Sequence, residues 1–162
     1  MELMSLFDKG IKFKDFINCG EDIAAKKLKE KYDAILFDFA VINKIKSSKV
    51  NNILAFAETW CPDCQVSLPI IAKICNINAI NLSILNREGH IEDMEPFYVD
   101  GKARIPTYVF MDKNFDIIGT WIERPKSIKE LTAKGDESWR IDYIKGIYDK
   151  EIINEFLEIL SR

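Results

Sequence analysis

The sequence lacks the features of a membrane-anchored or nucleic-acid-binding protein. No stretch reaches the roughly 18 apolar residues that a membrane-spanning helix needs, and residues 1–10 show no basic stretch, apolar core or cleavage site of a signal peptide. Basic residues are not in excess, because 23 Lys and Arg stand against 26 Asp and Glu. We therefore expect no membrane and no nucleic acid as partners, and we take the cytoplasm as the default location.

Histidine and cysteine are scarce as well, with one and four residues respectively. A reducing compartment argues against a framework of structural disulfides. A structural zinc site usually has four protein ligands, and the single His90 and the remote Cys19 supply no obvious second pair of ligands to a close pair of cysteines. We therefore expect neither a metal nor another cofactor.

The composition is typical of one globular domain, with 48% apolar and 30% charged residues in a chain of 162. No internal repeat, low-complexity tract or linker divides the sequence. We expect residues 1–162 to form a single domain.

Two cysteines at Cys-x-x-Cys spacing, Cys61 and Cys64, are the strongest chemical signal. They follow the apolar run Ile53–Ala57, a predicted buried strand, and Pro62 is suited to begin a helix that apolar residues continue to about Cys75. This spacing can close a disulfide across one helical turn, and a helix N-terminus favours a thiolate, which is the nucleophile in disulfide exchange. The pattern predicts a redox dithiol; two inert thiols and half of a metal site are the alternatives.

The remaining cysteines and the histidine are not expected to take part. Cys75 follows Cys61 by fourteen residues on the same predicted helix. At 1.5 Å per residue that separation is about 20 Å, so we expect Cys75 in the core. Cys19 is expected to pack, and His90 to lie in a surface loop.

Apolar periodicity predicts the other elements. Residues 12–47 are interpreted as two or three helices, because Glu21–Ser47 contains no Gly or Pro and its apolar residues recur at steps of three and four. The segment Ala34–Ile42 is apolar enough to be a buried strand instead. Three further strands are predicted at residues 79–85, 105–111 and 115–122, the last two joined by a turn at 112–114.

The C-terminal part is predicted to be one long helix that packs on the sheet, although Gly146 lies inside it. Six apolar positions define its predicted buried face: Ile141, Ile144, Tyr148, Ile152, Phe156 and Leu160.

Several of these features resemble the thioredoxin superfamily. Trp60 before Cys61 matches the Trp-Cys-x-x-Cys motif, Pro69 matches the proline that kinks the active-site helix, and residues 105–107 match the Ile-Pro-Thr that opens a core strand. A closer resemblance is to a bacterial subgroup with extra N-terminal helices, a Trp-Cys-x-Asp motif and an Arg-Pro pair after the hairpin, here Arg124 and Pro125.

This resemblance implies an α/β, thioredoxin-like fold. Its central mixed sheet has about four strands and is flanked by helices. Extra N-terminal helices are expected at residues 1–48, the redox core at 49–125 and a helical part at 126–162.

The resemblance also implies a substrate-binding surface. Trp60 is expected to shield the cysteines and to meet the partner. Pro106, between Ile105 and Thr107, is expected to be cis and to lie against the dithiol. The backbone of Ile105 is expected to pair with an extended segment of the substrate.

Two departures concern proton handling at Cys61, the expected attacking residue, and Cys64, the expected resolving residue. Many thioredoxins have a buried Asp six residues before the first Cys, where this chain has Ala55. Glu58 is either a substitute acting through water or a solvated loop residue. Pro62 and Asp63 replace the usual Gly-Pro, and a nearby Asp63 carboxylate would oppose thiolate formation against the helix dipole.

The sequence therefore predicts a thioredoxin-like protein-disulfide reductase of the cytoplasm. Its expected partners are disulfide-containing proteins and, as electron donor, a reductase or a low-molecular-weight thiol. A glutaredoxin-like reductase is the enzymatic alternative because Cys-Pro-x-Cys is its usual motif, although no Gly-Gly segment follows Met111. The other alternative is a non-catalytic binding module whose cysteines hold a metal or simply pack.

Overall fold

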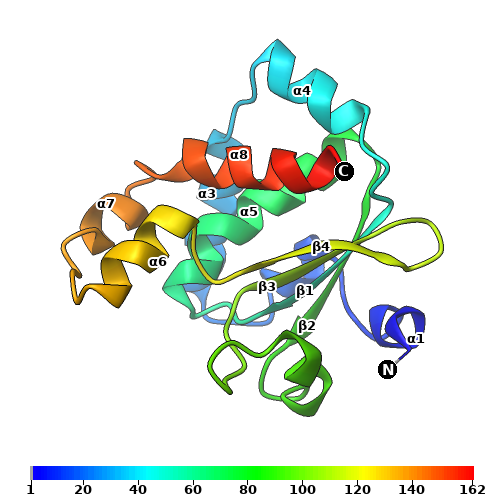
Figure 1. The fold of residues 1–162 in the computed structure, drawn as a ribbon, viewed down its shortest axis with the longest axis horizontal. Coiled ribbons are helices and arrows are strands. Elements are labelled where there is room, and N and C mark those ends of the chain that lie inside the picture. The colour runs from blue at the N-terminus through cyan, green and yellow to red at the C-terminus, as the bar shows by residue number, and fades with distance from the viewer. Residues whose placement is uncertain (1) are drawn as a thin grey trace.

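A mixed four-stranded sheet organises the computed structural model, which describes residues 2–162 (Figure 1). The strand order is β2-β1-β3-β4, with β1 parallel to β2 and the other two pairs antiparallel. The strands are β1 (Asn52–Ala57), β2 (Asn81–Asn86), β3 (Thr107–Met111) and β4 (Ile117–Ile122).

The predicted strands are present, and their starts differ from the predicted ones for local reasons. Every residue of β1 is buried, which explains why it reads as a continuous apolar run rather than an alternating one. Before β2 and β4 the chain turns through positive φ at Ala79 (49°) and Phe115 (66°), so pairing begins after these residues. In the second turn the carboxylate of Asp112 accepts hydrogen bonds from the backbone N–H groups of Asn114 and Asp116.

Helices lie on both faces of this sheet. Tyr108 of β3 contacts Ser67 of α5 (Pro62–Ile77) and Phe156 of α8 (Asp149–Leu160), so these two helices share one face. Phe56, the neighbour of Ala55 on β1, packs against Phe97 of η1 (Glu92–Phe97) on the other face. The remaining helices are α1 (Leu3–Phe7), α2 (Phe13–Phe16), α3 (Asp22–Ala34), α4 (Phe39–Lys46), α6 (Lys126–Ala133) and α7 (Arg140–Ile144). None of the helices within residues 2–162 is both long and apolar enough to cross a bilayer.

Residues 12–47 hold the three helices α2, α3 and α4, so the strand alternative for Ala34–Ile42 is wrong. Its apolar residues are largely not buried, because Leu36 and Phe39 are 90% and 78% exposed. Asp38 begins α4 instead, since its carboxylate accepts a hydrogen bond from the N–H of Val41.

The N-terminal segment contacts the rest of the domain at several points. Ile11 and Ile84 exchange two backbone hydrogen bonds at the free edge of β2. Lys31 of α3 forms an ion pair with Asp149 at the start of α8. Gly20 approaches the loop before the cysteines so closely that an added Cβ would lie 2.1 Å from Thr59 Oγ1.

This close approach makes the stability sensitive to residue 20. We expect Gly20→Ala to lower the free energy of unfolding by about 1–3 kcal/mol, the usual range for overpacking a buried contact. Thermal unfolding would show it as a drop of about 2–4 °C for each kcal/mol lost. Gly89→Ala is the matched control, because its Cβ would meet only the flexible end of Asn86, at 3.2 Å. Equal melting temperatures of the two variants would contradict the close contact.

The predicted single C-terminal helix is wrong, because α7 and α8 are separate. Gly146 has φ +89° and ends α7, with hydrogen bonds from its own N–H and from that of Ile147 to the last turn of the helix. Ile141 and Ile144 are consequently exposed, at 67% and 62%, while Tyr143 is buried.

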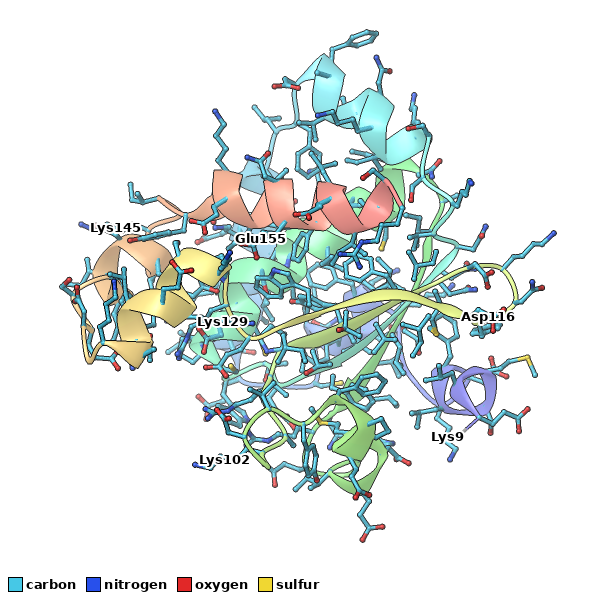
Figure 2. The ribbon with its side chains drawn as sticks, viewed as in Figure 1. Lys9, Lys102, Asp116, Lys129, Lys145 and Glu155 are labelled. Atoms are coloured by element: carbon cyan, nitrogen blue, oxygen red, sulfur yellow. The ribbon has the colours of Figure 1, made fainter. Side chains whose placement is uncertain are left out.

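The second half of the predicted buried face does pack, through α8. Ile152, Phe156 and Leu160 are buried, and the ring of Phe156 packs against aromatic side chains of β3 and β4. Glu155, labelled in Figure 2, links α8 to its neighbours: its carboxylate accepts hydrogen bonds from the indole N–H of Trp121 on β4 and from the backbone N–H of Lys126 at the start of α6.

Candidate active site

Cys61 and Cys64 lie at the N-terminus of α5, directly after the loop that leaves β1. Cys61 is the N-cap residue and Pro62 the first helical residue, where its missing N–H would have no helical partner. Both thiols are free and close to fully buried, with 5% of Cys61 and 0% of Cys64 exposed. Pro69 lies within α5 without ending it.

The loop before β3 meets the dithiol from the other side. Cys61 Sγ lies 3.9 Å from the carbonyl oxygen of Ile105, to which the thiol donates. The Ile105–Pro106 peptide bond is cis, and the Thr107 hydroxyl donates to the carbonyl of Arg104 at 2.7 Å. The structure thus brings together residues that are 44 positions apart in the sequence.

The two thiols have opposite protonation preferences. A hydrogen bond from the Cys64 thiol lowers the pKa of Cys61, against burial and the negative charge of Asp63, which raise it. Burial raises the pKa of Cys64 well above its usual value, and its hydrogen bond to Cys61 adds to this effect. Cys61 is therefore the better nucleophile, and Cys64 stays protonated in the reduced protein.

Asp63 is held by Arg124, which follows β4. Arg124 Nε and Nη2 donate to the two carboxylate oxygens at 2.9 and 3.1 Å, and both side chains are only 15% exposed. The same guanidinium pairs with Glu123 at 2.9 Å and stacks over the ring of Trp139 at 4.8 Å. Arg124 therefore offsets part of the negative charge of Asp63. The carboxylate still raises the pKa of Cys61, but the hydrogen bond from Cys64 lowers this pKa by more.

Glu58 and Trp60 flank the cysteines. The Glu58 carboxylate is half-buried and accepts a hydrogen bond from the backbone N–H of Glu88 at 3.1 Å, so it is engaged with the loop after β2. Trp60 is 55% exposed, and the guanidinium of Arg87 lies 5.5 Å from its ring centroid. A large part of the Trp60 ring is therefore accessible to a partner.

The remaining candidate residues lie elsewhere. Cys75 is buried on α5, where burial raises its pKa. The prediction that Cys19 packs is wrong: it is exposed, and its thiol donates to the carbonyl of Asp15. His90 is half-buried in the loop after β2, with Nδ1 3.0 Å from the carbonyl oxygen of Asn86. Within residues 2–162 no three His, Cys, Asp or Glu side chains gather as ligands for a metal ion.

The lowered pKa of Cys61 has a direct consequence for its reactivity. A lower pKa means a larger thiolate fraction at neutral pH. We expect alkylation of Cys61 by iodoacetamide to reach half its maximum rate at a pH below about 8.5, the pKa of a free thiol. Mass spectrometry separates this reaction from that of exposed Cys19, and buried Cys64 and Cys75 should stay unmodified. A midpoint at or above the free-thiol value would contradict the assignment.

The comparisons with known proteins agree on the fold. A family model described as Thioredoxin matches residues 10–140. The structure is similar to that of a protein of unknown function from Pseudomonas aeruginosa, with a TM-score of 0.86 and 22% identity over 99% of this chain and 98% of that one. An HIV epitope-scaffold matches with a TM-score of 0.84 and 21% identity over the same shares of the two chains. No curated protein matches the sequence. The predicted α/β, thioredoxin-like fold is confirmed.

Proposed function

Because the chain belongs to the thioredoxin family, we propose that it is a thiol-disulfide oxidoreductase that reduces protein disulfides through Cys61 and Cys64. The observation that carries the proposal is the placement of the two thiols, since Cys61 stands at the N-cap of α5 beside the cis Ile105–Pro106 bond and Cys64 is fully buried in the first turn of that helix. A reductant of this kind needs one reactive thiolate and one protected thiol.

The reaction proceeds in two exchanges. The Cys61 thiolate attacks one sulfur of the substrate disulfide, the substrate S–S bond breaks, and the other substrate sulfur leaves as a thiolate that takes a proton. Cys64 then attacks Cys61 in the mixed disulfide, releases the second substrate thiol and closes the Cys61–Cys64 disulfide. The substrate gains two electrons and the dithiol loses two.

Two features support a protein rather than a small molecule as substrate. The cis Ile105–Pro106 segment, which directly precedes β3, adjoins Cys61. An extended segment of a protein substrate at the thiol could therefore form backbone hydrogen bonds with Ile105. The half-exposed ring of Trp60 offers an amphipathic contact beside it. We assign Trp60, Ile105 and Pro106 to substrate binding, and Glu58, Pro62, Asp63 and Thr107 to support of the site.

The dithiol itself carries the electrons, so the proposed reaction needs no bound cofactor. Reduction of the Cys61–Cys64 disulfide falls to a separate reductase or to a low-molecular-weight thiol. We place the protein in the cytoplasm, where such donors keep thiols reduced.

A turnover assay tests this function. The protein is mixed with a disulfide-bonded protein substrate and dithiothreitol, and the rate of substrate reduction is compared with that of dithiothreitol alone. We expect a catalytic acceleration with the wild-type chain and none with Cys61→Ser. Replacing dithiothreitol by glutathione and glutathione reductase tests the glutaredoxin-like alternative, which requires efficient turnover with that donor. Absence of turnover with dithiothreitol would contradict the proposal.

A further inference from the structure

Arg104 directly precedes the cis Ile105–Pro106 bond, and its backbone is held in place. The Thr107 hydroxyl donates to the carbonyl of Arg104 at 2.7 Å. The next carbonyl, that of Ile105, lies 3.9 Å from Cys61 Sγ. Arg104 is therefore one residue away from the backbone group that contacts the attacking thiol.

The guanidinium of Arg104 lies beside Glu123, the residue that follows β4. Arg104 Nε is 3.6 Å from Glu123 Oε2. The backbone N–H of Glu123 donates to the carbonyl of Pro106 at 2.7 Å. These two contacts place the charged end of the Arg104 side chain next to the cis-proline segment.

Glu123 has a strained backbone. Its φ is +67°, in the left-handed region that residues other than glycine rarely adopt. In this conformation its carboxylate lies between two arginines, with Oε1 2.9 Å from Arg124 Nη1 and Oε2 3.6 Å from Arg104 Nε. Glu123 thus holds both guanidinium groups close to the dithiol.

The two arginines differ in how far their donors are used. Arg124 is 15% exposed and donates to both carboxylate oxygens of Asp63. The side chain of Arg104 is 37% exposed and donates no hydrogen bond within residues 2–162. Its Nε is buried without a hydrogen-bond partner, and its Nη groups are open to solvent. Arg104 therefore has donors available for an anion, whereas Arg124 is already engaged.

The loop that carries Arg104 has a second cation. Lys102, labelled in Figure 2, is exposed and lies two residues before Arg104. Two backbone hydrogen bonds between Val99 and Lys102, both 3.1 Å, close a tight turn with positive φ at Asp100 (51°) and Gly101 (70°). Against these two cations the turn carries one acidic side chain, so positive charge predominates on the approach to the cis-proline.

Resting on the proposed function, we infer that Arg104 is a specificity-determining residue, which binds an acidic side chain of the protein substrate next to the disulfide that Cys61 attacks. A guanidinium presents parallel N–H groups that match the two oxygens of a carboxylate. A substrate segment paired with Ile105 would run about 4.8 Å away, the spacing of neighbouring strands, which is within the length of an arginine side chain. The substrate class is therefore a protein with Asp or Glu within about two residues of the reacting cysteine.

Three synthetic peptides test this inference. Each has blocked termini and one cysteine flanked by Glu, by Gln or by Lys, and the cysteine carries an aromatic thiol in disulfide linkage. The Cys61 thiolate attacks the peptide sulfur, a Cys61–peptide disulfide forms, and the aromatic thiolate leaves and absorbs visible light. Each second-order rate constant is divided by that of the same peptide with dithiothreitol, which removes differences in intrinsic reactivity.

We expect the Glu peptide to react roughly three- to tenfold faster than the Gln peptide at low ionic strength, and the Lys peptide to react slowest. The preference should shrink in about 0.5 M salt, because salt screens partly exposed charges. Arg104→Gln should bring the ratio of Glu to Gln peptide to about one, and Arg104→Glu should favour the Lys peptide. Arg104→Lys keeps the charge without the paired donors, so its ratio should be intermediate.

Arg140→Gln is the matched control for the loss of one positive charge. Arg140 is an exposed arginine that pairs with Glu137, and its variant should keep the wild-type preference. A ratio near one in the wild type, or a wild-type ratio in Arg104→Gln, would overturn the inference. Failure of the wild-type protein to release the aromatic thiolate faster than Cys61→Ser, with all three peptides, would instead overturn the proposed function.

Discussion

The Cys64→Ser variant is expected to stop halfway through the reaction and to accumulate a mixed disulfide between Cys61 and its substrate. The variant keeps the attacking thiol at the start of α5 but removes the thiol that releases the substrate. Its serine hydroxyl does not attack a disulfide. Neither remaining cysteine can replace Cys64, because Cys75 is about 20 Å further along the same helix and Cys19 lies on the N-terminal segment.

The matched variant Cys61→Ser should show the opposite behaviour. It retains only the buried, protonated thiol of Cys64, so we expect no covalent complex with substrate. Both variants should lose turnover by roughly 10³-fold or more, the scale seen when an enzyme loses a residue that acts covalently. Non-reducing electrophoresis and intact mass detect the trapped complex. A complex trapped by Cys61→Ser and not by Cys64→Ser would reverse the assigned roles.

The Arg124→Met variant is expected to weaken both the fold and the Cys61 thiolate. It leaves the Asp63 carboxylate only 15% exposed without its bidentate partner. Loss of hydrogen bonds to a charged group costs about 1.5–3 kcal/mol of the free energy of unfolding. The negative charge of Asp63 raises the pKa of Cys61, and without the guanidinium that effect grows, so the alkylation midpoint of Cys61 should move to higher pH.

Two further variants separate the charge from the packing of Arg124. Asp63→Asn combined with Arg124→Met removes both charges and should return the Cys61 midpoint toward or below the wild-type value, with part of the stability recovered. Arg140→Met is the matched control, because Arg140 also stacks on Trp139, at 4.9 Å, but pairs with Glu137. An unmoved midpoint in Arg124→Met would show that the ion pair does not tune the thiolate.

Secondary structure was predicted correctly where residues close together in the sequence determine it. The apolar run before the cysteines became the buried strand β1, and Pro62 began α5. The C-terminal part was mispredicted because apolar periodicity continues across Gly146, whose left-handed conformation ends α7. A glycine just after a helix is itself a stop signal. A helix predicted to end before Gly146 would not have been aligned with the apolar face of α8, and Tyr143 could then have been predicted as its buried residue.

The candidate site was predictable in part. The Cys-x-x-Cys spacing locates the thiols, and the resemblance pointed to residues 105–107, which the fold brings beside Cys61. The partner of Asp63 was not predictable from the pattern, because Arg124 lies 61 positions away and only the fold of β4 sets their distance. The unused donors of Arg104 were missed for the same reason, since hydrogen-bond accounting needs the neighbours of a side chain in space.

The central claim is that Cys61 and Cys64 form a reversible redox pair, and thiol trapping across buffers of graded reduction potential tests it most directly. The protein is equilibrated in each buffer, denatured, alkylated and weighed, so that alkylated cysteines are counted. We predict one two-electron transition at a reducing potential, with loss of two reactive thiols, and no such transition in Cys61→Ser or Cys64→Ser. If the pair stays reduced in all but strongly oxidising buffers, or if the transition survives in either variant, the account is wrong.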